Sequence, residues 1–424
     1  MKVTNFQTHW DSALVLFRQR DAWPLQELGD AAPLERLEQA LRLHFHVLAR
    51  CPEVVELQPE KTADCFVWLA SQFSSPDFKV RQRGHRRAGE ILVEGGGKGL
   101  GAYAALCLFS PPEDDHGTLD LYRNHEKLRP ILFSLWREQG FQVPGALYNR
   151  AELQRRDPEL QQAALAYAAD NPKVSLELFR AYYQPLLGVA RPVGVTSGVI
   201  CAALRGGLLR GDRDLPGALR RAIELEVSSA GQATLLRLGA LCGDAKLYPV
   251  LRSRLKTQPQ DGARLLALYA RPEALVDLHA ALDSAPAMDS AADAWYWMTG
   301  QRLARKPRLS LVGGEAQETN GATMPDSEAA HVWLEQNRAN VSEEARLLWG
   351  CPISIPLLQT AAQDFAGRGD ADLLDLLAVH LQRPLGLTAG GWRSVRRQKL
   401  PALGGNTAKP NSAPMPERKG IRRV

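Results

Sequence analysis

Two ten-residue stretches, thirty positions apart, decide the fold of this 424-residue chain: GQATLLRLGA at Gly231–Ala240 and DGARLLALYA at Asp261–Ala270. Their alanines and leucines fall at matching positions, with the three- and four-residue steps that place apolar side chains on one face of an α-helix. A third stretch, Ala291–Gly300, keeps the offset and replaces leucine by bulkier residues. One helix pair cannot bury such a face alone, so the recurrence predicts helix pairs that stack against their neighbours.

The same helical spacing extends over most of the chain, with further helices expected near 77–94, 99–109 and 117–139. We therefore predict an all-α fold, an α-solenoid of HEAT-like helix pairs with an N-terminal helical region. An irregular helical bundle is the alternative, because Leu/Ala-rich helices give a similar pattern. The expected parts are an N-terminal helical region (1–110), HEAT-like repeats (111–305), an irregular loop (306–325), C-terminal helical repeats (326–399) and a disordered basic tail (400–424).

Charge is distributed unevenly along the chain. The net charge is +5, but the segment from Arg393 to the end holds nine basic side chains and one acidic one, so residues 1–392 carry −3. A mildly acidic body argues against a nucleic-acid partner for the folded part. The 45% hydrophobic and 23% charged residues are typical of a globular protein and exclude wholesale disorder.

The sequence predicts a cytoplasmic protein. No apolar stretch approaches the length of a membrane span, and the first residues lack the apolar core of a secretory signal. The six cysteines are far apart, form no C-x-x-C and sit mostly in apolar runs, as expected of buried thiols in a reducing compartment.

A glycine-rich segment, Glu94–Gly101 (EGGGKGLG), is the strongest cofactor-like motif. Gly97, Gly99 and Ala102 fit a loose dinucleotide fingerprint, and a strand at Ile91–Val93 would precede it. No second strand and no acidic residue follow at the required distance, so we interpret the segment as a turn between two helices.

No catalytic or metal-ligating pattern stands out. His44 and His46 are two residues apart on an expected helix and point in different directions. His116 follows Glu113-Asp114-Asp115, which a capped helix start explains as well as a cation site does. We expect no catalytic residue, no cofactor and no metal.

One basic run could hold a phosphate backbone. It comprises Lys79, Arg81, Arg83, Arg86 and Arg87, with Asp77 and Glu90 as partial counter-charges. A solvated helix face is the other interpretation. This run supports the alternative function, a helical-repeat nucleic-acid binder or a DNA-repair-like enzyme.

Two groups are candidates for protein binding. Trp295, Tyr296 and Trp297 are consecutive, so they cannot all face one core if they are helical, and exposed aromatic residues are frequent interface anchors. Packing of these rings under the 306–325 loop is the other interpretation. The basic residues Arg393, Arg396 and Arg397 could meet an acidic partner.

Several soft motifs resemble an uncharacterised proteobacterial family of HEAT-like repeat proteins. They are Leu34–Leu41 (LERLEQAL), Leu347–Pro352 (LLWGCP) and Pro384-Leu385-Gly386 with Trp392-Arg393. The residues Arg42, Leu43 and His44 depart from the family pattern. Members are often encoded beside type VI secretion spike and effector genes. The resemblance therefore implies a bacterial, non-enzymatic adaptor or chaperone-like factor whose partner is a secretion effector or spike component, and it brings no catalytic residues.

Overall fold

The computed structural model describes residues 6–109, 117–154, 156–188, 195–312, 315–337, 342 and 344–403. Across these ranges the fold is all-α, as the sequence predicted. Strands occur there only as three two-stranded antiparallel pairs, of which β1 (Gly29–Asp30) with β6 (Phe365–Ala366) and β4 (Leu347–Leu348) with β5 (Cys351–Pro352) are two residues long. None of the described helices combines the length and the apolar character needed to cross a lipid bilayer.

The chain divides into two compact units. Unit 1 comprises residues 1–185, 192–212 and 358–405, and unit 2 comprises residues 186–191, 213–357 and 406–424. Unit 1 therefore combines the N-terminal half of the chain with its C-terminal helices, a pairing of distant segments that the sequence did not indicate.

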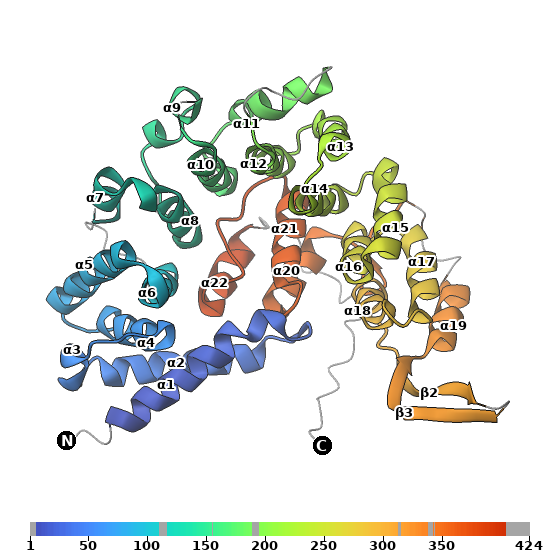
Figure 1. Ribbon diagram of the computed structural model, residues 1–424, viewed down its shortest axis with the longest axis horizontal. Helices are drawn as coiled ribbons and strands as arrows, with labels where there is room; N and C mark the ends of the chain where they lie inside the picture. Colours follow the sequence, from blue (N-terminus) through green and yellow to red (C-terminus); the bar gives the residue numbers. More distant parts are fainter. Residues whose placement is uncertain are drawn as a thin grey trace. The chain divides into compact units, whose positions relative to one another are not determined.

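Unit 1 is built from helices in two layers (Figure 1). The first helices are α1 (Phe6–Asp21), α2 (Ala32–Leu48) and the short α3 (Glu53–Glu56). The inner layer then holds α4 (Thr62–Phe73), α6 (Gly96–Leu108), α8 (Arg129–Gln139), α10 (Pro158–Asp170) and α12 (Ser197–Leu208). The outer layer holds α5 (Phe78–Glu94), α7 (Gly117–Asn124), α9 (Arg150–Gln154) and α11 (Leu176–Tyr183).

Close helix contacts in unit 1 depend on glycine at a few positions. A Cβ at Gly101 of α6 would lie 2.3 Å from the carbonyl oxygen of Thr62 and 2.9 Å from Cβ of Cys65 on α4. A Cβ at Gly206 of α12 would lie 2.3 Å from the ring of Phe179 on α11. At these positions helices approach one another more closely than a side chain there would allow, within the inner layer for α4 and α6 and between the layers for α11 and α12.

The C-terminal helices of unit 1 pack against its inner layer. They are α20 (Ile355–Asp364), whose first residues belong to unit 2, α21 (Asp370–Leu381) and α22 (Arg393–Leu403). Arg205 of α12 pairs with Asp375 of α21 at 3.0 Å and with Asp170 of α10 at 2.8 Å. The indole N–H of Trp392, just before α22, donates to the carbonyl of Leu108 at 2.8 Å. Side-chain contacts thus join segments that lie far apart in the sequence.

Unit 2 repeats the two-layer arrangement (Figure 1). Its inner helices are α14 (Ser229–Cys242), α16 (Pro259–Tyr269) and α18 (Met288–Thr299), and these three contain the recurring stretches of the sequence. Its other helices are α13 (Leu215–Leu225), α15 (Tyr248–Thr257), α17 (Glu273–Leu282) and α19 (Ser327–Asn337). The thirty-residue offset therefore corresponds to every second helix, and these inner helices pack side by side.

The prediction of an irregular loop over 306–325 is wrong. Strand β2 (Arg305–Val312) pairs with β3 (Glu315–Pro325) in an antiparallel hairpin, whose register shifts between Pro307 and Leu309. The expected tail also begins too early, because α22 continues to Leu403. Residues 404–424 lie outside the described part of the chain.

Candidate functional site

The candidate site begins with α5, which carries the basic run. The side chain of Asp77 accepts a hydrogen bond from the backbone N–H of Lys79 at 2.8 Å, and this N-cap fixes the start of the helix. Lys79, Arg83 and Arg86 follow one another at steps of four and three residues, so they lie on the same face of α5. All three side chains are exposed.

The opposite face of α5 is buried, and glycine controls its distance from neighbouring helices. A Cβ at Gly84 would lie 3.0 Å from Cβ of Gln72, and a Cβ at Gly89 would lie 2.9 Å from Cδ1 of Leu121. Glycine at position 89 therefore lets Leu121 of α7 approach the backbone of α5. The buried imidazole of His85 stacks on the ring of Phe73, with centroids 4.1 Å apart.

Helix α7 supplies the second wall. The buried hydroxyl of Thr118 accepts a hydrogen bond from the indole N–H of Trp136 at 3.1 Å, which fixes α7 to α8. Asp120 is exposed and pairs with Arg123 at 3.0 Å. Asn124 and the following His125 also line this side.

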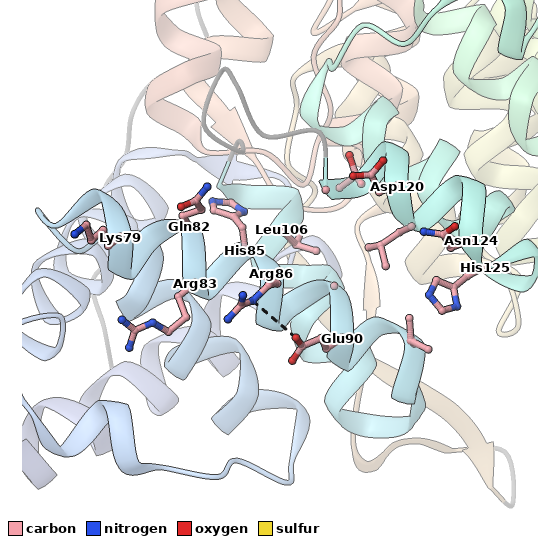
Figure 2. A pocket seen from close by; sticks show the side chains of 15 residues that line it. Lys79, Gln82, Arg83, His85, Arg86, Glu90, Leu106, Asp120, Asn124 and His125 are labelled. Carbon is pink, nitrogen blue, oxygen red and sulfur yellow. Dashed lines mark ion pairs between the residues drawn. The ribbon is translucent and has the colours of Figure 1, made fainter.

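A groove of about 1000 Å³ lies between these walls. Figure 2 shows Lys79, Arg83 and Arg86 on the α5 side, Asp120, Asn124 and His125 on the α7 side, and Leu106 of α6 between them. The groove thus has a basic wall and a partly apolar floor, and the carboxylates of Glu90 and Asp120 lie on opposite sides. Among the described residues, the lining comprises Lys79, Gln82, Arg83, His85, Arg86, Gly89, Glu90, Val93, Leu106, Gly117, Thr118, Asp120, Leu121, Asn124 and His125.

The structure brings together only part of the predicted basic run. Arg81 turns away from the groove and donates to the backbone carbonyls of Ser75 at 2.7 Å and Pro76 at 3.0 Å. Arg87 pairs with Glu90 at 2.8 Å and with Glu94 at 3.7 Å, and the hydrogen bond to Glu90 raises the pKa of Arg87. Arg81 and Arg87 therefore interact with neighbouring groups of the chain and do not line the groove.

The sequence did not single out the α7 wall, because residues 117–139 have the spacing of one continuous helix. The structure divides this range after Asn124, where a short 3₁₀ turn (Glu126–Leu128) separates α7 from α8. Pro130, in the first turn of α8, was the available signal of a new helix start.

Burial contradicts the prediction that the tryptophans of α18 are accessible anchors. Trp295 is fully buried, and its indole N–H donates to the side-chain oxygen of Gln301 at 3.2 Å; Trp297 is buried as well. Tyr296 reaches the surface in part, and the guanidinium of Arg302 lies 4.6 Å from its ring centroid.

The arginines proposed for protein binding also differ from expectation. Arg393 and Arg396 are each 2% exposed, and both face Asp370, at 3.7 Å and 2.6 Å. The backbone N–H of Arg393 donates to Glu38 at 2.9 Å. Only the side chain of Arg397 is exposed, and it pairs with Glu35 of α2 at 2.7 Å. The first two residues therefore stabilise the packing of α22 within unit 1 and are not a docking surface.

The glycine segment is a turn between two helices, as interpreted from the sequence. Gly95 and Gly96 have φ angles of 74° and 65°, a region that favours glycine; Gly95 separates α5 from α6, and Gly96 is the first residue of α6. Residues 91–93 are helical. The strand that a dinucleotide site requires is therefore not present there.

Within the described ranges, no three His, Cys, Asp or Glu side chains gather into a possible metal site. Nδ1 of His44 lies 2.9 Å from Nδ1 of His9, while Nδ1 of His46 lies 3.4 Å from the carbonyl oxygen of Ser74. His116 and the acidic residues before it lie outside the described residues.

Comparison with known proteins adds no assignment, because no family model, curated protein or solved structure matches this chain.

Proposed function

We propose that this chain is a non-enzymatic scaffold of HEAT-like helix pairs, and that it binds a segment of another protein in the groove between α5 and α7. The supporting observation is the composition of the groove. Three exposed cations stand along one wall, and the floor and the opposite wall contribute the apolar residues Leu106 and Leu121. Interfaces commonly combine an apolar centre with a charged rim that orients the partner.

A protein segment fits this groove better than a nucleic acid does. A phosphate backbone carries negative charge along its whole length, so it would be repelled by Glu90 and Asp120 on the two sides. None of the described lining residues is Phe, Tyr or Trp, which single-stranded nucleic-acid sites use for base stacking. Arg81 and Arg87 also have partners within the chain.

The resemblance of Leu34–Leu41 and Leu347–Pro352 to a family encoded beside type VI secretion genes guides the choice of the first partners to test. A secretion effector or a spike component is the protein that we propose to examine first. The adaptor would hold such a partner before it is exported.

The experiment is affinity purification from cells of the source organism, comparing the native chain with two variants. The groove variant carries Lys79→Glu, Arg83→Glu and Arg86→Glu. The control carries Arg18→Glu, Arg36→Glu and Arg50→Glu, an equal charge change at exposed positions outside the groove. We expect a protein that the native chain and the control retain and the groove variant loses, and that binds the purified native chain directly.

An identical set of proteins bound by all three chains would reject the groove as the binding site. Recovery of nucleic acid alone, lost with the groove variant, would instead favour the helical-repeat nucleic-acid binder.

A further inference from the structure

The spacing of the groove cations gives information about the shape of the partner. Lys79 and Arg86 are seven residues apart on α5, so the basic stripe covers about two turns, or about 10 Å along the axis. Arg83 lies between them at the intermediate turn. A partner helix lying along α5 would place carboxylates at the same pitch if its acidic residues were three or four positions apart.

These cations are available for a partner. Neither Nζ of Lys79 nor the guanidinium of Arg83 makes an ion pair or a hydrogen bond with any other residue that the structure describes. Arg86 has one weak partner, Glu90, at 3.9 Å, and its side chain is 77% exposed. At Lys79 and Arg83 an approaching acidic group would displace no ion pair with a described residue, whereas at Arg86 it would compete with Glu90.

The remaining lining is suited to an apolar side chain. Leu106 is buried in the floor, Val93 is 43% exposed at the last turn of α5, and Leu121 lies against Gly89. Val93 and Leu121 lie beyond the basic stripe toward the C-terminal end of α5, whereas Leu106 lies beside His85 (Figure 2). Acidic groups are thus favoured near Lys79 and Arg83, whereas an apolar group is favoured near Val93 and Leu121.

We infer that the groove binds an acidic amphipathic helix of a partner protein, with carboxylates spaced at i, i+3 or i+4, and i+7 against the basic stripe and leucine-like residues against the floor. The inference rests on the proposed function and specifies the chemistry of the bound segment. Helix α5 has 17 residues and a length of about 25 Å, so a helix of about 16 residues would span the groove.

The test uses the full chain and three designed helical peptides of about 16 residues. The first has glutamate on one face and leucine on the other, the second replaces each glutamate by glutamine, and the third replaces each by lysine. Fluorescence anisotropy of labelled peptide gives the affinity at ionic strengths from about 0.02 to 0.3 M. A DNA duplex of similar length, about 16 base pairs, is measured in parallel.

We expect saturable binding of the glutamate peptide that weakens with salt, and clearly weaker binding of the glutamine peptide. Each exposed ion pair is worth roughly a threefold change in affinity, so Lys79→Gln, Arg83→Gln and Arg86→Gln together weaken binding roughly thirtyfold at low salt. The control variant, Arg18→Gln, Arg36→Gln and Arg50→Gln, keeps the affinity for the glutamate peptide within about twofold of the native value. The charge-reversed groove variant gains affinity for the lysine peptide.

Absence of saturable binding of the glutamate peptide up to about 1 mM overturns the inference, as does equal weakening by the groove and control variants. If the groove still captures a protein in cells, the proposed function stands, and only the inference that the bound segment is an acidic helix is wrong. If the DNA duplex binds more tightly than the glutamate peptide and the groove variant abolishes duplex binding, both the inference and the proposed function are wrong.

Discussion

Arg346 allows a direct test of what holds the helix pairs of unit 2 together. Its guanidinium donates to the backbone carbonyls of Leu241 at 2.8 Å, Ala240 at 3.0 Å and Leu268 at 2.6 Å, and its Nε donates to Tyr269 at 3.1 Å. These carbonyls lie in the last turns of α14 and α16, where helix ends carry partial negative charge; among them Ala240 also accepts from the N–H of Gly243 at 3.2 Å. One cation therefore caps two neighbouring inner helices.

The magnitude follows from the four hydrogen bonds that Arg346→Met would remove. Four hydrogen bonds from a charged donor contribute about 1.5–2 kcal/mol each, or about 6–8 kcal/mol together. Burial lowers the pKa of Arg346 to about 10, so keeping this side chain charged in the folded state costs roughly 3 kcal/mol, which the methionine variant avoids. The expected net loss is about 3–5 kcal/mol. For a unit of this size, that corresponds to a decrease in Tm of roughly 10 °C.

Differential scanning calorimetry of the full chain measures the effect. Lys256→Met is the matched control, because it removes an exposed cation from the same unit, and it should change Tm by less than about 2 °C. Arg346→Lys keeps a charge but cannot reach four carbonyls, so it should recover less than half of the loss. A decrease below about 3 °C for Arg346→Met would show that the carbonyls find other partners, and the capping argument would fail.

Three further predictions concern unit 1. In urea denaturation, Gly101→Ala should lower the free energy of unfolding by about 3 kcal/mol because the added Cβ would collide with the backbone of α4. The control Gly97→Ala should change it by less than about 1 kcal/mol, because the nearest atom to the added Cβ is 3.4 Å away. Burial lowers the pKa of His44 below its usual 6.5, so the unfolded chain takes up a proton at a higher pH than the folded chain does. The free energy of unfolding should therefore fall as the pH drops through about 6.5, and His44→Gln should reduce this pH dependence. Asp370→Asn removes the carboxylate that two buried arginines share, and it should lower the free energy of unfolding by about 3–5 kcal/mol. Helix α22 should then become sensitive to limited trypsin digestion, and unchanged digestion would contradict the role of these ion pairs.

The helices could be predicted from the sequence because their signal is local. Leucine and alanine recur at helical spacing wherever a helix buries one face, and α14, α16 and α18 carry that pattern at a constant offset. The hairpin formed by β2 and β3 was missed for the opposite reason. Its pairing joins residues up to twenty positions apart, so no pattern within one short window of sequence marks it.

The sequence indicated one wall of the groove but not the other. The basic stripe on α5 was visible as charge at helical spacing, but the α7 wall carries only ordinary residues, such as Leu121 and Asn124, whose position depends on tertiary packing. Nothing in the sequence around Gly89 indicated that its missing side chain would admit Leu121.

The arginines illustrate why charge in a sequence does not identify a surface. Arg393 and Lys79 are equivalent in a count of basic residues, yet the structure gives them opposite roles. Arg393 lies in a buried cluster with Asp370 and Glu38, whose carboxylates come from segments more than twenty residues away and could not be assigned to it beforehand. Lys79 has no such counter-charge among the described residues, and its side chain is exposed. A cation can attract a partner only to the extent that the fold has left it unpaired, so a docking surface must be sought among the charges that remain after every internal pair has been identified.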